Sequence, residues 1–199
     1  MRAKTLYAVV LVTAVALSSA CHRLTFLPGQ EPEHKPVVCE GRYALCTSAA
    51  CAPLATFNPK TGKVESTSAL CECAVANGPS LGDLSCADRA PQGKDGNLLV
   101  STYSFGETAT HPAMTCAEGS PWAFCYDQPC VVDPKDPTKA RCTCPLRTSG
   151  EYATLGGACD KAKCATTIWS AAAPDAMKEA SNLLAKDEGL KAVPANSCQ

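Results

Sequence analysis

Histidine, aromatic residues and clustered positive charge are scarce in this 199-residue sequence. Three histidines and 6% aromatic residues leave few catalytic bases and few large side chains for a core. The formal net charge of −1, without a basic cluster, argues against binding to nucleic acid. The sequence also lacks a Cys-x-x-Cys motif and a glycine-rich phosphate loop, so it has no signature of thioredoxin-type redox chemistry or of phosphate binding.

Long apolar runs are missing too, except at the N-terminus. Arg2 and Lys4 precede an uncharged stretch, residues 5–17, which is rich in Val, Ala and Leu. Small residues follow at 18–20, and this order is typical of a secretory signal. We therefore predict a signal peptide at residues 1–20. The run is shorter than the ~20 apolar residues of a spanning helix, which disfavours the alternative of an uncleaved membrane anchor.

The end of this leader, Leu17-Ser18-Ser19-Ala20-Cys21, resembles the lipobox of bacterial lipoproteins. Ala20 and Cys21 match that motif, whereas Ser18 stands where the family prefers a large aliphatic residue. The resemblance covers only the leader and implies that cleavage exposes Cys21, whose thiol carries diacylglycerol. The protein would then be exported and lipid-anchored in the cell envelope, at the outer membrane if the source is diderm. Ordinary cleavage after Ala20, giving a secreted soluble protein, is the alternative.

Cysteine, in contrast, is abundant, and twelve of the fifteen cysteines fall into two sets with one spacing pattern. The first set is Cys39, Cys46, Cys51, Cys71, Cys73 and Cys86, and the second is Cys116, Cys125, Cys130, Cys142, Cys144 and Cys159. In both sets C-x4-C precedes C-x-C. We therefore predict a flexible tether at 21–38 followed by two cysteine-rich repeats, 39–110 and 111–172.

The number of cysteines suggests how they pair. Fifteen is odd, and assigning Cys21 to lipid leaves an even fourteen. We expect three bridges inside each repeat, none between the two sets, and a last bridge from Cys164 to Cys198. Disulfides at this density persist in oxidising compartments and supplement a small core. Oxidised cysteines are not metal ligands, so we expect neither a metal site nor a cofactor.

Turn residues between the cysteines predict a mainly β fold. Asn58-Pro59 and Asp133-Pro134 occupy equivalent places in the two repeats and favour β-turns. A hairpin with return strands at 64–73 and 140–144 would place both cysteines of each C-x-C on one face of a strand. The predicted class is therefore a small, disulfide-rich, mainly β protein built from two hairpin-containing repeats.

The last segment, 173–199, has a different pattern. Ala176, Met177, Ala180, Leu183 and Leu184 recur at helical spacing. Pro174 and Asp175 suit the start of a helix, and Gly189 suits its end. We predict a C-terminal helix from about residue 175 to 186 with a core-facing apolar side.

Two short motifs raise the possibility of chemistry. His111, Met114 and Cys116 offer imidazole, thioether and thiolate groups of the kind that copper accepts. Ser80 lies in Gly78-Pro79-Ser80-Leu81-Gly82, which fits the G-x-S-x-G pattern of a nucleophile elbow. We interpret the first motif as a linker between repeats and the second as a turn. We therefore expect no enzyme.

The function that remains is a non-enzymatic binding or structural module of the cell envelope. Exposed loops such as Pro53–Ser66 would contact a protein or glycan partner, because loops on a rigid scaffold carry most binding residues. A disulfide-rich inhibitor of an exported enzyme is the first alternative, and a secreted hydrolase using Ser80 is a distant one.

Overall fold

The computed structural model describes residues 36–104, 112–188 and 198, all within one compact unit that spans residues 34–199. The predicted signal peptide, Cys21, most of the tether and His111 lie outside the described residues. The described part is small, rich in disulfides and mainly β, with a C-terminal helix, which confirms the predicted fold class. None of its helices is both long and apolar enough to cross a membrane.

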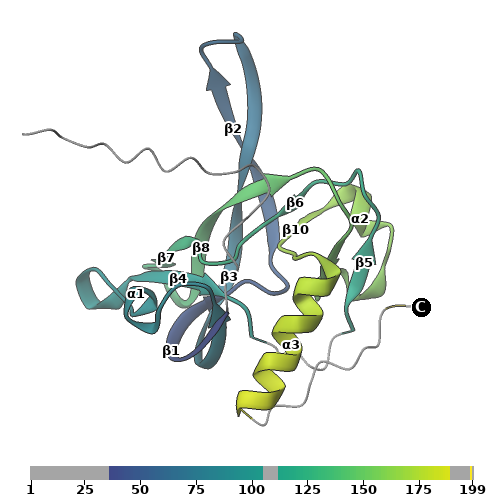
Figure 1. The fold of residues 1–199 in the computed structure, drawn as a ribbon. Coiled ribbons are helices and arrows are strands. Elements are labelled where there is room, and N and C mark those ends of the chain that lie inside the picture. Colours follow the sequence, from purple (N-terminus) through teal and green to yellow (C-terminus); the bar gives the residue numbers. More distant parts are fainter. Residues whose placement is uncertain (1–35, 105–111, 189–197, 199) are drawn as a thin grey trace, which may run out of the picture. The chain divides into compact units, whose positions relative to one another are not determined.

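One sheet contains eight of the strands, in the order β10-β2-β3-β1-β4-β7-β8-β6 (Figure 1). These strands are β1 (Val37–Leu45), β2 (Ala50–Asn58), β3 (Lys63–Gly82), β4 (Leu98–Thr102), β6 (Trp122–Ala123), β7 (Pro129–Asp133), β8 (Asp136–Arg147) and β10 (Ile168–Trp169). A second sheet pairs β5 (Met114–Cys116) with β9 (Tyr152–Thr154). Short helices α1 (Cys86–Arg89) and α2 (Lys163–Thr166) lie in the connections.

The long strand β3 organises the larger sheet. Its first half pairs with β2 on one edge and, from Ser68 to Ala74, with β8 on the other, while its second half pairs with β1. Because β1 also pairs with β4, β4 with β7, and β7 with β8, the five strands β3-β1-β4-β7-β8 close into a ring. Closure leaves fewer open strand edges, which would otherwise pair with other chains. The two predicted repeats thus contribute to one sheet.

Side chains alternate between the two faces of the paired strands, and this alternation determines which residues fill the ring. In β3, Ala69, Cys71 and Cys73 are buried, and in β8, Ala140, Cys142 and Cys144 are buried. The residues between them are exposed or half-buried, as expected when successive side chains point to opposite faces. Cysteine and alanine therefore take the core positions that larger aliphatic residues occupy in most domains.

Helix α3 (Pro174–Glu188) confirms the predicted C-terminal helix, extended by about one residue at one end and two at the other. Met177, Ala180 and Leu184 on its inner face join the main core cluster. A smaller cluster contains Met114, Trp122 and Tyr152, and the rings of Trp122 and Tyr152 stack with centroids 5.8 Å apart. Apolar burial thus continues beyond the ring of strands.

Seven disulfides join all fourteen cysteines of the described residues, and none connects the first predicted cysteine set with the second. The pairs are Cys39–Cys86, Cys46–Cys73, Cys51–Cys71, Cys116–Cys164, Cys125–Cys144, Cys130–Cys142 and Cys159–Cys198. Each set thus forms the same nested pair of hairpin bridges. The duplication itself stays a prediction.

The predicted Cys164–Cys198 bridge is wrong, and so is the expectation of three bridges within the second set. Helix α2 brings Cys164 to Cys116 on β5, and Cys159 bonds to Cys198. The backbone N–H of Cys198 also donates to the carbonyl of Ala113, 3.0 Å away, which places Cys198 next to the start of β5. Counting cysteines could not distinguish Cys159 from Cys164, because both lie in the same connection only five positions apart.

Tryptic mapping without reduction distinguishes the two pairings, because Lys161 and Lys163 separate the two cysteines. We expect peptide 148–161, which contains Cys159, to be linked to peptide 192–199, which contains Cys198. Mass spectrometry before and after reduction identifies the linked pair. Linkage of peptide 164–178 to peptide 192–199 would contradict the observed pairing.

Candidate binding hairpin and the disulfide cluster at its base

The exposed segment predicted to make contacts, Pro53–Ser66, forms the outer part of a β-hairpin built from β2 and β3 (Figure 1). Strand β10 pairs with β2 only at Ala50 and Cys51, and β8 pairs with β3 only from Ser68 onward. Within the described chain, residues 52–67 therefore pair only with the opposite strand of the hairpin itself. Both outer edges of this hairpin are left without a neighbouring strand from the described residues, and Figure 1 shows the hairpin extending past the other strands.

Glu65 holds the end of the hairpin together. Its carboxylate accepts hydrogen bonds from the Asn58 amide at 3.0 Å and from the Thr61 hydroxyl at 2.9 Å. Its carbonyl accepts a bond from the Thr56 hydroxyl at 3.1 Å. Asn58 Oδ1 also accepts from the N–H of Lys60 at 2.9 Å, the local bond that makes Asn a turn residue. The predicted turn after Asn58 is thus present and has its own polar support.

A β-bulge lies partway along the hairpin, where the register shifts between Leu54 and Thr56. The Ser66 hydroxyl spans this irregularity by donating to the Leu54 carbonyl at 2.9 Å. Bulges increase local twist and redirect side chains, and they are common near functional sites. Strand β2 carries no charged side chain from Ala50 to Asn58, so no charge blocks strand addition at its open edge, although Pro53 offers no N–H to an added strand.

Four disulfides lie at the base of the hairpin. Cys51, Cys71, Cys142 and Cys130 stand opposite one another in successive strands β2, β3, β8 and β7. Cys51–Cys71 and Cys130–Cys142 each bridge directly paired residues, with Cα atoms 4.1 and 4.2 Å apart. The hairpin is therefore covalently closed where it leaves the ring of strands.

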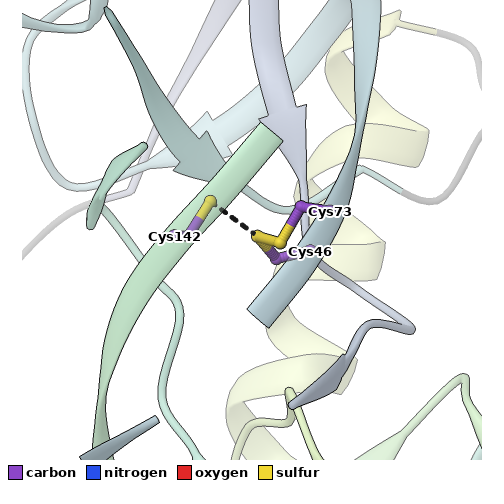
Figure 2. Close-up of side chains that lie close together, drawn as sticks. All are labelled: Cys46, Cys73 and Cys142. Atoms are coloured by element: carbon purple, nitrogen blue, oxygen red, sulfur yellow. Dashed lines mark hydrogen bonds between the residues drawn. A yellow bond between two sulfur atoms is a disulfide. The ribbon is translucent and has the colours of Figure 1, made fainter. Parts of the chain in front are cut away.

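The remaining two bridges, Cys46–Cys73 and Cys125–Cys144, pack against these four aligned cysteines. Cys46 Sγ lies 3.6 Å from Cys142 Sγ, as Figure 2 shows, and Cys125 Sγ lies 3.3 Å from Cys71 Sγ. The bridges of one cysteine set thus contact those of the other. Because these four cysteines are fully buried, the contacts form the centre of the core.

The sulfur atoms are close enough together to resemble a metal site. Cys46, Cys73 and Cys142 form one group and Cys51, Cys71 and Cys125 another, with the sulfurs in each group within 4.8 Å of one another. All six sulfurs belong to disulfides, and metals bind the thiolate form of cysteine. These groups would become ligands only after reduction, so the oxidised protein offers no thiolate here.

Among the residues that the structure describes, which exclude His111, the other motifs singled out from the sequence do not assemble into a site. Ser80 is buried in β3 and its hydroxyl donates to the Cys39 carbonyl at 3.5 Å, so the predicted turn at 78–82 is wrong. The segment is a strand because it pairs with β1 over its whole length, from Gly41–Gly78 to Val37–Gly82. Met114 is fully buried, and Cys116 is in a disulfide, which removes the thiolate proposed for copper.

Seven bridges in a small domain indicate an oxidising, extracellular compartment, in agreement with the sequence.

The sequence located the hairpin segment and its turn. It missed the contact between the two sets of bridges, which no spacing pattern contains. Comparisons of this chain with family models, with curated proteins and with solved structures find no match.

Removing the Cys51–Cys71 bridge should loosen the hairpin selectively. With both cysteines changed to alanine, we expect the free energy of unfolding to fall by at most about 3 kcal/mol, the chain-entropy value for an isolated loop of this size. The enclosing Cys46–Cys73 bridge already restricts the same segment and reduces the loss. Urea denaturation measures this loss. Hydrogen exchange should accelerate at residues 52–67, and the matched Cys130→Ala, Cys142→Ala variant should lack that local effect. Equal exchange in both variants would contradict a role in rigidifying the hairpin.

The Glu65 contacts give a pH dependence. Hydrogen bonds from Asn58 and then Thr61 lower the pKa of Glu65 below its ordinary 4.5. A lowered folded-state pKa contributes stability above the unfolded value, and this contribution is lost as pH falls through the folded pKa. We therefore expect the hairpin end to loosen in acid. NMR titration should show the Glu65 pKa rising toward 4.5 in Asn58→Ala; an unchanged pKa would refute the contact.

Proposed function

We propose that this protein is an exported, non-enzymatic binding module that presents the β2–β3 hairpin to a partner protein. The observation that carries the proposal is an exposed hairpin with two open edges on a base of four packed disulfides. Rigidity before binding lowers the entropic cost of association. An uncharged open strand edge favours partners that add a strand through main-chain hydrogen bonds, which a glycan cannot do.

The proposal includes attachment to the cell envelope through lipid on Cys21, with a secreted soluble form as the alternative. Support comes from the lipobox-like leader and from the pairing of all fourteen remaining cysteines, which leaves none for Cys21. If the source is diderm, the outer membrane is the proposed location. Residues 22–36 would then separate the domain from the membrane surface, because Val37 and Val38 belong to β1.

Enzyme function is not part of the proposal. The Ser80 hydroxyl is buried against a main-chain carbonyl, so it lacks the exposure that a nucleophile elbow gives its serine. A disulfide-rich inhibitor of an exported enzyme is the second candidate, and the rigid, internally hydrogen-bonded hairpin end favours it. Whether the protein is a binding module or an inhibitor, the hairpin is the part that contacts the partner.

A photo-crosslinking residue placed at Ala55 tests the hairpin, with Ala165 in α2 as the matched control because both alanines are exposed. In native envelopes we expect one dominant adduct from position 55 and none from 165. If the adduct is an enzyme whose activity falls on binding, the inhibitor reading is correct. Equal adducts at both positions, or none at 55, would overturn the role of the hairpin.

Mass spectrometry of the mature protein tests the anchor. We expect Cys21 as the N-terminal residue with the added mass of diacylglycerol. The Cys21→Ser variant should lose the lipid and shift from the membrane fraction to the soluble fraction. A mature chain with an unmodified Cys21, or one that begins elsewhere, would sink the lipid-anchor hypothesis without affecting the hairpin.

A further inference from the structure

A separate cavity of about 220 Å³ lies between α3 and the end of β3. Tyr103, Phe124 and Tyr126 form an aromatic wall, with the Tyr126 ring 5.2 Å from that of Tyr103 and 6.1 Å from that of Phe124. Tyr103 is held in place, because it is buried and its hydroxyl donates to the Ala171 carbonyl at 2.8 Å. Leu81 is another fully buried lining residue.

Helix α3 leaves room opposite this wall. Ala176 and Ala180, one helical turn apart, line the cavity with small side chains. Glu179 from the same helix and Asp83 from the segment after β3 also line it, and both are exposed. No lysine, arginine or histidine lies among the described lining residues. The cavity therefore combines aromatic faces with two carboxylates.

The nearby cation, Arg89, is not among the residues that line the cavity. Its guanidinium donates to the carbonyls of Val37 at 2.6 Å and Ser80 at 3.3 Å. Burial raises the pKa of Tyr126, and Asp83 and Asp127 raise it further, by more than Arg89 lowers it. At the Tyr126 hydroxyl the two aspartates thus outweigh Arg89.

We propose that this cavity binds an alkylammonium group. A cation over aromatic faces is attracted by the ring quadrupoles, and carboxylates at the same site add Coulombic attraction. The volume suits a compact ammonium on a chain of about four methylenes, which is the form of a lysine side chain. A free alkylamine and a lysine of a partner protein share this chemistry. The site uses none of residues 52–67, so it is independent of the hairpin.

NMR titration tests the proposal with three probes: n-butylammonium chloride, an end-blocked lysine peptide and neutral 1-pentanol. We expect shifts at Ala176, Ala180 and Tyr126, with a dissociation constant on the order of 1 mM for the ammonium probes and weaker binding of the alcohol. Tighter binding of the peptide than of butylammonium identifies a protein lysine as the ligand; the reverse identifies a free amine. Measurements are repeated in Lys35→Ala, because Lys35 is the chain's own cation next to Pro36 in the lining.

Two variants and a control locate the site. Ala176→Leu should fill the cavity and weaken binding at least about tenfold, because the ligand would lose its space. Asp83→Asn should weaken it about two- to fivefold, as expected for one exposed charge pair. Glu151→Gln, an exposed carboxylate elsewhere, should change nothing. The proposal is overturned if 1-pentanol binds as tightly as butylammonium, if no probe shifts these residues, or if Asp83→Asn and Ala176→Leu both bind normally.

Discussion

The contact between two pairs of disulfides in the middle of the sheet is the constraint on which the rest of the structure depends. Strands β3 and β8 pair so that Cys71 stands opposite Cys142, and the bridges of the two cysteine sets then pack sulfur against sulfur. Cysteine is small, so a core made from it and alanine buries little area per residue. Covalent closure supplies the stability that such a core lacks.

This arrangement connects the core to the exposed hairpin. The Cys51–Cys71 bridge lies at the point where the hairpin loses its neighbouring strands, so the base is fixed while the outer part is open. Local hydrogen bonds around Glu65 then order the far end without help from the body of the domain. A hairpin that is rigid at its base and at its far end loses little conformational entropy when it binds a partner.

The cavity beside α3 has a different origin. It exists because Ala176 and Ala180 face the aromatic wall where larger residues would close the gap. The same helix supplies Met177 and Leu184 to the core, so one face packs while its neighbour leaves space. Two candidate recognition features therefore occur on one domain, one formed by open strand edges and the other by missing side-chain volume.

The sequence alone determined the class of this fold, because spacing and composition are local properties. The C-x-C segments predicted that both cysteines lie on one strand face, Asn58-Pro59 predicted a turn, and the spacing of Met177, Ala180 and Leu184 predicted a helix, all of which are present. Pairings between distant segments are not encoded in such patterns. Only the tertiary structure decided that β3 joins β8, that Cys164 bonds to Cys116 and Cys159 to Cys198, and that residues 78–82 extend a strand. Each of these depends on which distant backbone lies alongside, and loop-closure entropy distinguishes such partners only weakly.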